Sequence, residues 1–128
     1  MKQRNGFTLK NYNPAQWADL IKESGARYSV ITTKHHDGVA MYDTKMNTLS
    51  SVKATPAKKD MIKPFFEELR KRDIKCGTYF SLIDWSHNDY PGFLKDSGRY
   101  EVKNDYDRWN RFRNFFQGQI KEISTQYN

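Results

Sequence analysis

Two strand-like stretches, each preceded by a helix-like stretch, constrain the fold of this chain more than any other feature. The β-branched residues 30–33 favour an extended backbone, because such side chains pack well on a pleated surface. Residues 74–83 have two faces that are largely free of charge, as expected of a strand covered on both sides. Helices that alternate with strands predict parallel strands joined by crossovers, which is the α/β class.

Three segments carry apolar residues at helical spacing. The first begins with Asn13 as N-cap and Pro14 at the first helical position, and Gly25 ends it. The second begins near Asp60, and a third, longer helix runs from about residue 105 to residue 127. The apolar positions are Trp17, Leu20 and Ile21 in the first helix, Ile62, Phe65, Phe66 and Leu69 in the second, and Trp109, Phe112, Phe116, Ile120, Ile123 and Tyr127 in the third. We expect the stripe of the third helix to pack against the sheet.

The resulting order is helix, strand, helix, strand, helix, without a linker or an internal repeat. Two parallel strands leave both sheet edges unpaired, and three apolar helix faces have little sheet to cover. The chain therefore has the pattern of a piece of a larger fold. The irregular segment Val39–Lys59 is a candidate binding loop, because it follows the first strand directly.

Two histidines, His35 and His36, stand where the first strand ends. Side chains of a regular strand alternate between faces, so the two rings share a pocket only if the backbone bends there. Gly38 provides the conformational freedom for that bend. The carboxyl end of a buried strand is also where α/β folds bind ligands.

The composition bounds the function classes. The chain has 128 residues with 22 basic and 15 acidic side chains, a net charge of +7. The basic residues are spread along the chain, which favours solvated faces over a nucleic-acid site. Cys76 is the single cysteine and lies in an apolar run, so we expect a small core residue rather than a disulfide or zinc site. No apolar run reaches the length of a membrane span, and we expect neither a metal nor a cofactor.

Several runs together resemble the α-L-fucosidases of glycoside hydrolase family 29. The resemblance extends from about Tyr12 to Asn128 and rests on residues 17–28, on the helix and strand of residues 59–81, on residues 84–85 and on Lys-His-His-Asp-Gly at positions 34–38. It implies a partial (β/α)8 barrel with a helix–strand–helix–strand–helix core. It also implies an enzyme that hydrolyses terminal α-L-fucosides with retention of configuration, so the implied partner is a fucosylated glycan, with no nucleic acid and no membrane.

The resemblance assigns roles to four residues of this chain. His35 and His36 match the adjacent histidines that bind fucose hydroxyls in the family. Tyr79 matches an aromatic sugar contact on the next strand, although Phe80 stands where the family often has a second tyrosine. Trp85 matches a loop residue that lines the sugar site or the leaving-group side.

The resemblance also implies what this chain lacks. Retaining glycosidases need two carboxylates about 5 Å apart. The family's nucleophile lies on the strand after the third helix, which would follow Asn128, and the first barrel strand would precede Met1. We therefore expect an internal fragment of a catalytic domain with no catalytic residue of its own. We expect no signal peptide at Met1, and full-length members of the family that the chain resembles are usually periplasmic, secreted or lysosomal.

Alternatives stay open at this stage. The chain could be a non-catalytic fucose-binding module, or a basic nucleic-acid-binding α/β domain. Asp37, Asp84 and Asp89 could act as acid and base, but Asp37 and Asp84 fit better as residues that bond nearby backbone N–H groups where the strands end. The loop aromatics Trp85, Tyr90 and Phe93 could stack on a sugar or hold the loop in place.

Overall fold

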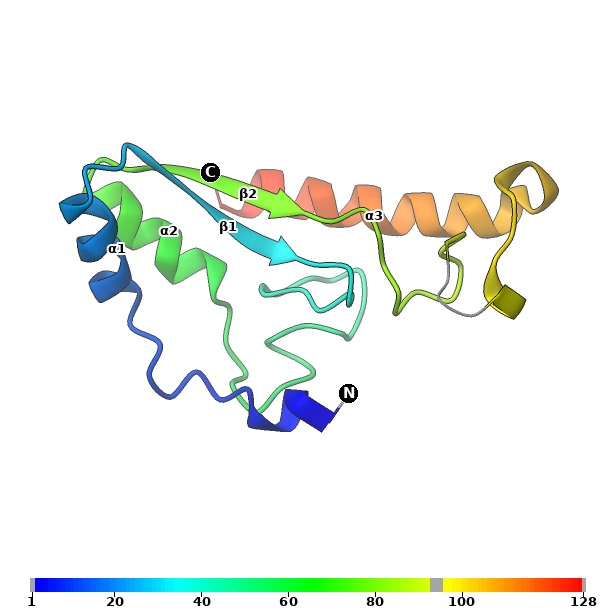
Figure 1. The fold of residues 1–128 in the computed structure, drawn as a ribbon, viewed down its shortest axis with the longest axis horizontal. Helices are drawn as coiled ribbons and strands as arrows, with labels where there is room; N and C mark the ends of the chain where they lie inside the picture. Colours follow the sequence, from blue (N-terminus) through cyan, green and yellow to red (C-terminus); the bar gives the residue numbers. More distant parts are fainter. Residues whose placement is uncertain (1, 93–95, 128) are drawn as a thin grey trace.

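The predicted order of helices and strands is confirmed by a computed structural model, which describes residues 2–92 and 96–127. Short 3-10 helices at Lys2–Gly6, Asp96–Gly98 and Val102–Asn104 accompany the main elements (Figure 1). The helices and strands are α1 (Pro14–Glu23), β1 (Tyr28–Lys34), α2 (Ile62–Lys71), β2 (Lys75–Phe80) and α3 (Tyr106–Gln126).

Polar side chains accept the first N–H groups of α1 and α2, and the sequence predicts the one at α1, Asn13. Asn13 Oδ1 accepts the N–H of Gln16 at 3.1 Å, as in an N-cap. Asp60 Oδ1 accepts the N–H groups of Ile62 and Lys63 at 2.8 and 3.1 Å, so α2 begins two residues after Asp60. Each cap satisfies backbone donors that the first helical turn leaves unpaired.

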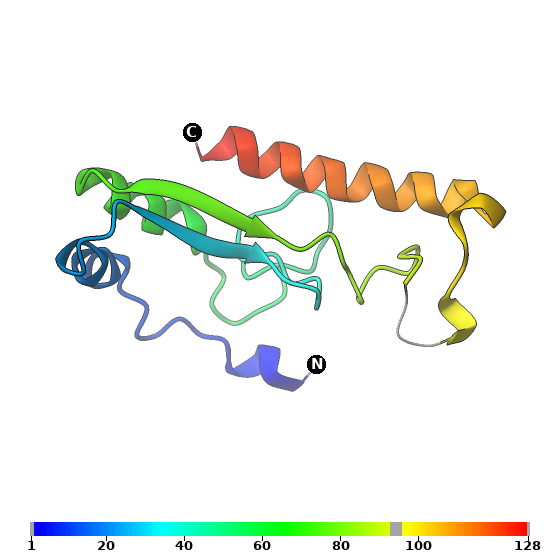
Figure 2. The same ribbon diagram turned by 45° about the horizontal axis from the view of Figure 1, so that its top comes forward.

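The two strands form a parallel sheet (Figures 1 and 2). Tyr28 pairs with Lys75 and Thr32 with Tyr79, and the register shifts between Thr32 and Lys34. This arrangement is a partial α/β fold, and the two strands do not close into a barrel. The strand predicted for residues 74–83 ends at Phe80 instead.

The early end of β2 has a local cause. The Ser81 N–H still donates to the Lys34 carbonyl at 3.0 Å, but the Ser81 hydroxyl then donates to the Ile83 carbonyl at 3.3 Å. This turn carries Asp84 into the interior, where its side chain is fully buried. The polar contacts of Asp84 therefore override the uncharged, strand-like pattern of residues 81–83.

The expectation of a strand covered on both faces is wrong for the described residues. One face of the sheet packs against the core through Ile31, Cys76 and Phe80. The other face carries Val30 and Tyr79, which are 55% and 49% exposed. The free thiol of Cys76 is only half-buried, although it does contact the core as predicted. The sheet thus has one open face.

The core lies between α2, the segment after β1 and the end of α3. Much of the candidate binding loop 39–59 is buried there, including Ala40, Tyr42 and Thr44 at 0% exposure. In α1 the buried residue is Ala18, whereas Leu20 of the predicted stripe is 59% exposed. The small Ala18 side chain lets α1 lie close to α2, beside the first residues of both strands (Figure 1).

Helix α3 corrects the expectation that its stripe packs on the sheet. Tyr127, the residue that follows its last turn, packs on Phe66 of α2, with ring centroids 6.2 Å apart. Its first half packs on the loop after β2, where Phe115 lies 4.5 Å from the His87 ring. Ile120, in between, remains 42% exposed. The helix therefore lies beside the sheet and extends past the ends of the strands (Figure 2).

Candidate functional site

The histidine turn at the end of β1 has the predicted bend. Gly38 adopts φ +83°, and its N–H donates to the His35 carbonyl at 3.1 Å. Asp37 Oδ1 accepts the N–H of Val39 at 3.0 Å, which confirms its predicted role in the turn. As a result the His35 and His36 rings lie side by side, with centroids 3.9 Å apart.

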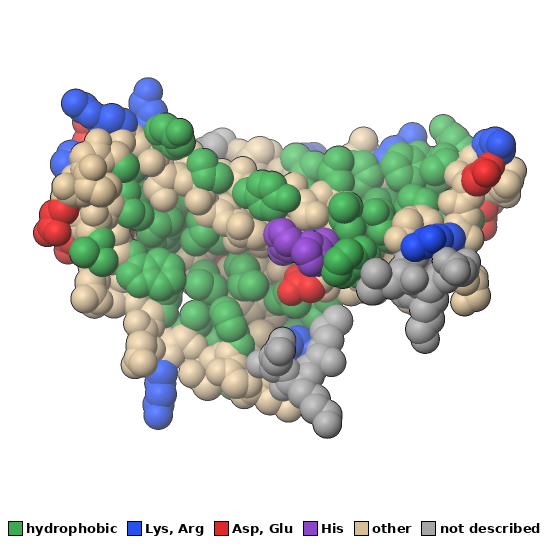
Figure 3. All heavy atoms as spheres, in the orientation of Figure 1, with side chains coloured by type: hydrophobic (Ala, Val, Ile, Leu, Met, Phe, Trp, Pro, Cys, Tyr) green, Lys and Arg blue, Asp and Glu red, His purple; other side chains and the backbone are tan. Residues whose placement is uncertain are grey.

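The other two predicted residues adjoin this pair. The Trp85 ring lies 4.0 Å from the His36 ring, and the Tyr79 ring lies 5.9 Å from the His35 ring. The backbone N–H of Trp85 donates to the His36 carbonyl at 2.8 Å, which links the loop after β2 to the turn after β1. We call the row Tyr79–His35–His36–Trp85 the aromatic row. Figure 3 shows histidine side chains at the molecular surface with hydrophobic side chains around them.

Beneath the aromatic row lies an ion pair that sequence reasoning missed. Lys34 Nζ is 3.0 Å from Asp84 Oδ2, and neither side chain is exposed to solvent. Lys34 Nζ also donates to the Ile83 carbonyl at 3.4 Å and lies 4.7 Å from the centroid of the Phe80 ring. Burial lowers the pKa of the Lys34 ammonium, and the Asp84 carboxylate opposes that shift.

Asp84 also meets its sequence-based expectation. Its Oδ1 accepts both the N–H of Ser86 at 3.0 Å and the Ser86 hydroxyl at 2.6 Å. A Cβ at Gly38 would lie 2.0 Å from Ser86 Oγ and 2.5 Å from Asp84 Oδ1. The turn after β1 therefore packs directly on Asp84 and Ser86, and the residue pattern of the chain carries no signal for this contact.

The carboxylates nearest the aromatic row in sequence already have structural partners. Asp37 bonds its own turn, and Asp84 is held in the ion pair. Asp89 accepts from Arg111 Nε at 2.9 Å and Arg111 Nη2 at 3.0 Å, and the hydrogen bond to Arg111 lowers the pKa of the Asp89 carboxyl. None of the three is free to act as an acid and base in this arrangement.

Of the other two loop aromatics, Tyr90 holds the loop in place rather than extending the row. Tyr90 packs on Phe112 of α3, with ring centroids 5.3 Å apart, and Phe93 lies outside the described residues. His87 Nδ1 accepts the N–H of Asp89 at 3.1 Å, and burial lowers the pKa of its imidazole. Within residues 2–92 and 96–127, no three His, Cys, Asp or Glu side chains are grouped as a metal site would require.

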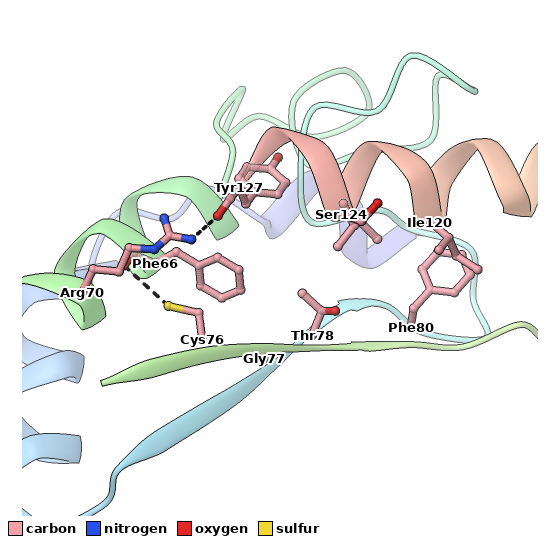
Figure 4. Close-up of a pocket in the computed structure, with 10 residues that line it drawn as sticks. Phe66, Arg70, Cys76, Gly77, Thr78, Phe80, Ile120, Ser124 and Tyr127 are labelled. Atoms are coloured by element: carbon pink, nitrogen blue, oxygen red, sulfur yellow. Dashed lines mark hydrogen bonds between the residues drawn. The ribbon is translucent and has the colours of Figure 1, made fainter. Parts of the chain in front are cut away.

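A cleft of about 340 Å³ opens between β2 and α3, on the sheet face opposite Tyr79 (Figure 4). Its walls include Cys76, Thr78 and Phe80 from β2 and Ile120 from α3. The Arg70 guanidinium donates to the Tyr127 carbonyl at one end of the cleft. This cleft is separate from the aromatic row. Of the helices in the described part of the chain, none has the length and hydropathy to cross a bilayer.

Comparisons with known proteins agree on one family. The α-L-fucosidase family model matches residues 1–128. The tissue α-L-fucosidase of Bos taurus is 38% identical over 90 residues, which is 70% of this chain and 19% of that protein. This chain therefore spans about a fifth of the length of that curated relative.

Solved structures show the same similarity. α-L-Fucosidase isoenzyme 1 from Paenibacillus thiaminolyticus superposes with a TM-score of 0.84 at 34% identity, covering 99% of this chain and 31% of its own. A family GH29 α-L-fucosidase from Bacteroides thetaiotaomicron, trapped as a covalent intermediate with 2-fluoro-fucosyl fluoride, gives 0.85 at 30% identity, covering 98% and 27%. The chain belongs to the α-L-fucosidase family of glycoside hydrolases.

Proposed function

We propose that this chain forms the fucose-recognition part of the catalytic domain of a retaining exo-α-L-fucosidase. The observation that carries the proposal is the aromatic row, which joins the carboxyl ends of two adjacent parallel strands in a chain of this family. In the whole protein, β1 and β2 would be neighbouring strands of a (β/α)8 barrel. Barrel enzymes bind their substrates at that end of the strands.

The chemistry of the row suits a sugar. A neutral imidazole both donates and accepts hydrogen bonds, as sugar hydroxyls do. The hydrogen bonds that hold the turn use the carbonyls of His35 and His36, so the turn itself does not occupy their ring nitrogens. The half-exposed rings of Tyr79 and Trp85 offer an apolar surface on either side. His35 and His36 are our candidates for the hydroxyl contacts.

Retention of configuration needs a nucleophile and a separate acid/base carboxylate. The covalent intermediate trapped in the B. thetaiotaomicron relative supports that mechanism for the family. Asp37, Asp84 and Asp89 are engaged in structural contacts here. We therefore assign both catalytic carboxylates to segments of the whole protein outside this chain, which supplies recognition rather than bond cleavage.

The proposal is tested by steady-state hydrolysis of an aryl α-L-fucoside by the whole protein. His35→Ala removes hydrogen bonds to the sugar, so we expect kcat/KM to fall about 10- to 100-fold, since each factor of ten corresponds to about 1.4 kcal/mol. Tyr106→Ala is the control, because Tyr106 is 58% exposed on α3 and outside the row.

Two outcomes would contradict the proposal. An unchanged kcat/KM in His35→Ala would remove the recognition role of the histidine. Binding of L-fucose by the whole protein without any hydrolysis would instead favour the non-catalytic fucose-binding module. A nucleic-acid-binding domain would bind nucleic acid with an affinity that falls steeply as the salt concentration rises, whereas the affinity for fucose would not fall in this way.

A further inference from the structure

The Lys34–Asp84 ion pair is buried more completely than stability alone explains. Both side chains are at 0% exposure, and taking two charges out of water is costly. Apolar residues of similar volume often replace such pairs without loss of stability. We therefore ask which parts of the structure this ion pair holds in place.

Both residues of the ion pair are sequence neighbours of residues in the aromatic row. Lys34 precedes His35, and Asp84 precedes Trp85. The ion pair thus connects the last residue of β1 to the loop after β2. In each segment, the residue that follows the charged one contributes a ring to the row. The backbone N–H of Trp85 donates to the His36 carbonyl at 2.8 Å, which is a second link between the same two segments.

The backbone is shaped to bring Lys34 inward. Along β1 exposed and less exposed residues alternate until Thr33 and Lys34, which are both fully buried. The sheet register shifts at the same place, between Thr32 and Lys34. Such an irregularity re-aims the side chains that follow it. It allows Lys34 to reach the buried Asp84 while His35 stays exposed at the surface.

Asp84 is constrained on its other side as well. Its second oxygen accepts two hydrogen bonds from Ser86, and the backbone of Gly38 packs against the same atoms. The carboxylate therefore contacts β1 through Lys34, the histidine turn through Gly38 and its own loop through Ser86. A shift of Asp84 would move the His36 and Trp85 segments relative to each other.

We propose that Lys34 and Asp84 are positioning residues of the sugar site. The ion pair sets the separation of the His36 and Trp85 rings, and through it the affinity for fucose. Neither side chain touches the sugar, because both are closed off from solvent. This inference rests on the proposed function of the aromatic row.

The test compares affinity with stability in the whole protein. Lys34→Met/Asp84→Asn removes both charges together and keeps an oxygen at position 84 for Ser86. We expect a thermal midpoint close to that of the wild type, because no buried charge is left unpaired. We expect the Kd for L-fucose, measured by calorimetric titration, to rise at least about tenfold, because the rings lose their set separation.

The matched control is an ion pair of the same charges at the surface. Lys103 and Glu101 lie 2.8 Å apart with side chains 78% and 66% exposed. Lys103→Met/Glu101→Gln should change neither the thermal midpoint nor the Kd. If the buried double variant is as stable as the wild type and binds L-fucose equally well, the positioning role is wrong and the pair is only structural.

A second variant decides the matter if the double variant does not fold. Ser86→Ala removes only the hydroxyl that Asp84 Oδ1 accepts, at a half-buried position. We expect a folded protein whose Kd for L-fucose rises several-fold, and an unchanged Kd would overturn the inference. His35→Ala separates the two proposals: if it leaves the Kd unchanged, the recognition role itself fails, whereas an effect of His35→Ala alone rejects only the positioning role.

Discussion

At the scale of single residues, Gly38 is subject to two independent requirements. Its φ of +83° lies in the region that L side chains rarely adopt, and a Cβ there would overlap Ser86 and Asp84. The conformational requirement could be inferred from the sequence, because the histidines had to leave the strand. The crowding could not, since it depends on an ion pair that residue patterns do not show.

Gly38→Ala should therefore destabilise the whole protein by more than about 2 kcal/mol, because backbone strain and steric overlap add. The measurement is the free energy of unfolding in urea. Gly25→Ala isolates the first cause: Gly25 has φ +81° but nothing within 4 Å of the added Cβ. Gly6→Ala, with neither feature, is the neutral control. An equal loss in Gly38→Ala and Gly25→Ala would show that the packing on Asp84 contributes nothing.

At the scale of elements, apolar spacing predicts where the helices lie. It does not predict where β2 ends or which segments the helices pack against. The predicted start of α2 near Asp60 and end of α3 near Tyr127 agree with the structure to within two residues. Residues 81–83 looked like strand, but the burial of Asp84 forces a turn there. Periodicity tells which face of α3 is apolar, but it cannot tell that α2 and a loop, rather than the sheet, cover that face.

One contact joins α3 to α2 in a testable way. The Tyr127 hydroxyl donates to Asp60 Oδ2 at 2.6 Å, while Asp60 Oδ1 accepts the first two N–H groups of α2. Burial and this hydrogen bond raise the pKa of the Tyr127 hydroxyl. Tyr127→Phe should lower the free energy of unfolding by about 1.5 kcal/mol, as expected for a hydrogen bond to a carboxylate.

The control for this prediction is Tyr106→Phe, because Tyr106 lies at the other end of α3 and is 58% exposed. The free energy of unfolding of the Tyr106→Phe variant should match that of the wild type. If Tyr127→Phe also matched the wild type in urea unfolding, the junction between α3 and α2 would depend on ring packing alone.

At the scale of the whole molecule, the described chain is an open arrangement with one bare sheet face. Tyr28, Val30 and Tyr79 on that face are 68%, 55% and 49% exposed. The helix–strand order and the family could be predicted from the sequence, and so could all four members of the row. The open face could not, because charge-free strand faces look the same whether or not this chain itself covers them.

The isolated chain of 128 residues should therefore be marginally stable. Exposed apolar surface of this kind is rarely tolerated by monomers. We expect a broad thermal transition, followed by circular dichroism, and binding of a hydrophobic dye before the transition begins. A sharp cooperative transition of the isolated monomer would contradict this prediction, and the whole protein under the same conditions is the reference.

The central claim is that the aromatic row contacts fucose, and a crystal structure of the whole protein with L-fucose tests it most directly. Our account predicts ring nitrogens of His35 and His36 within hydrogen-bonding distance of sugar hydroxyls, about 3 Å. It also predicts the Tyr79 or Trp85 ring against the sugar. A fucose bound away from both histidines, for example in the cleft between β2 and α3, would contradict it.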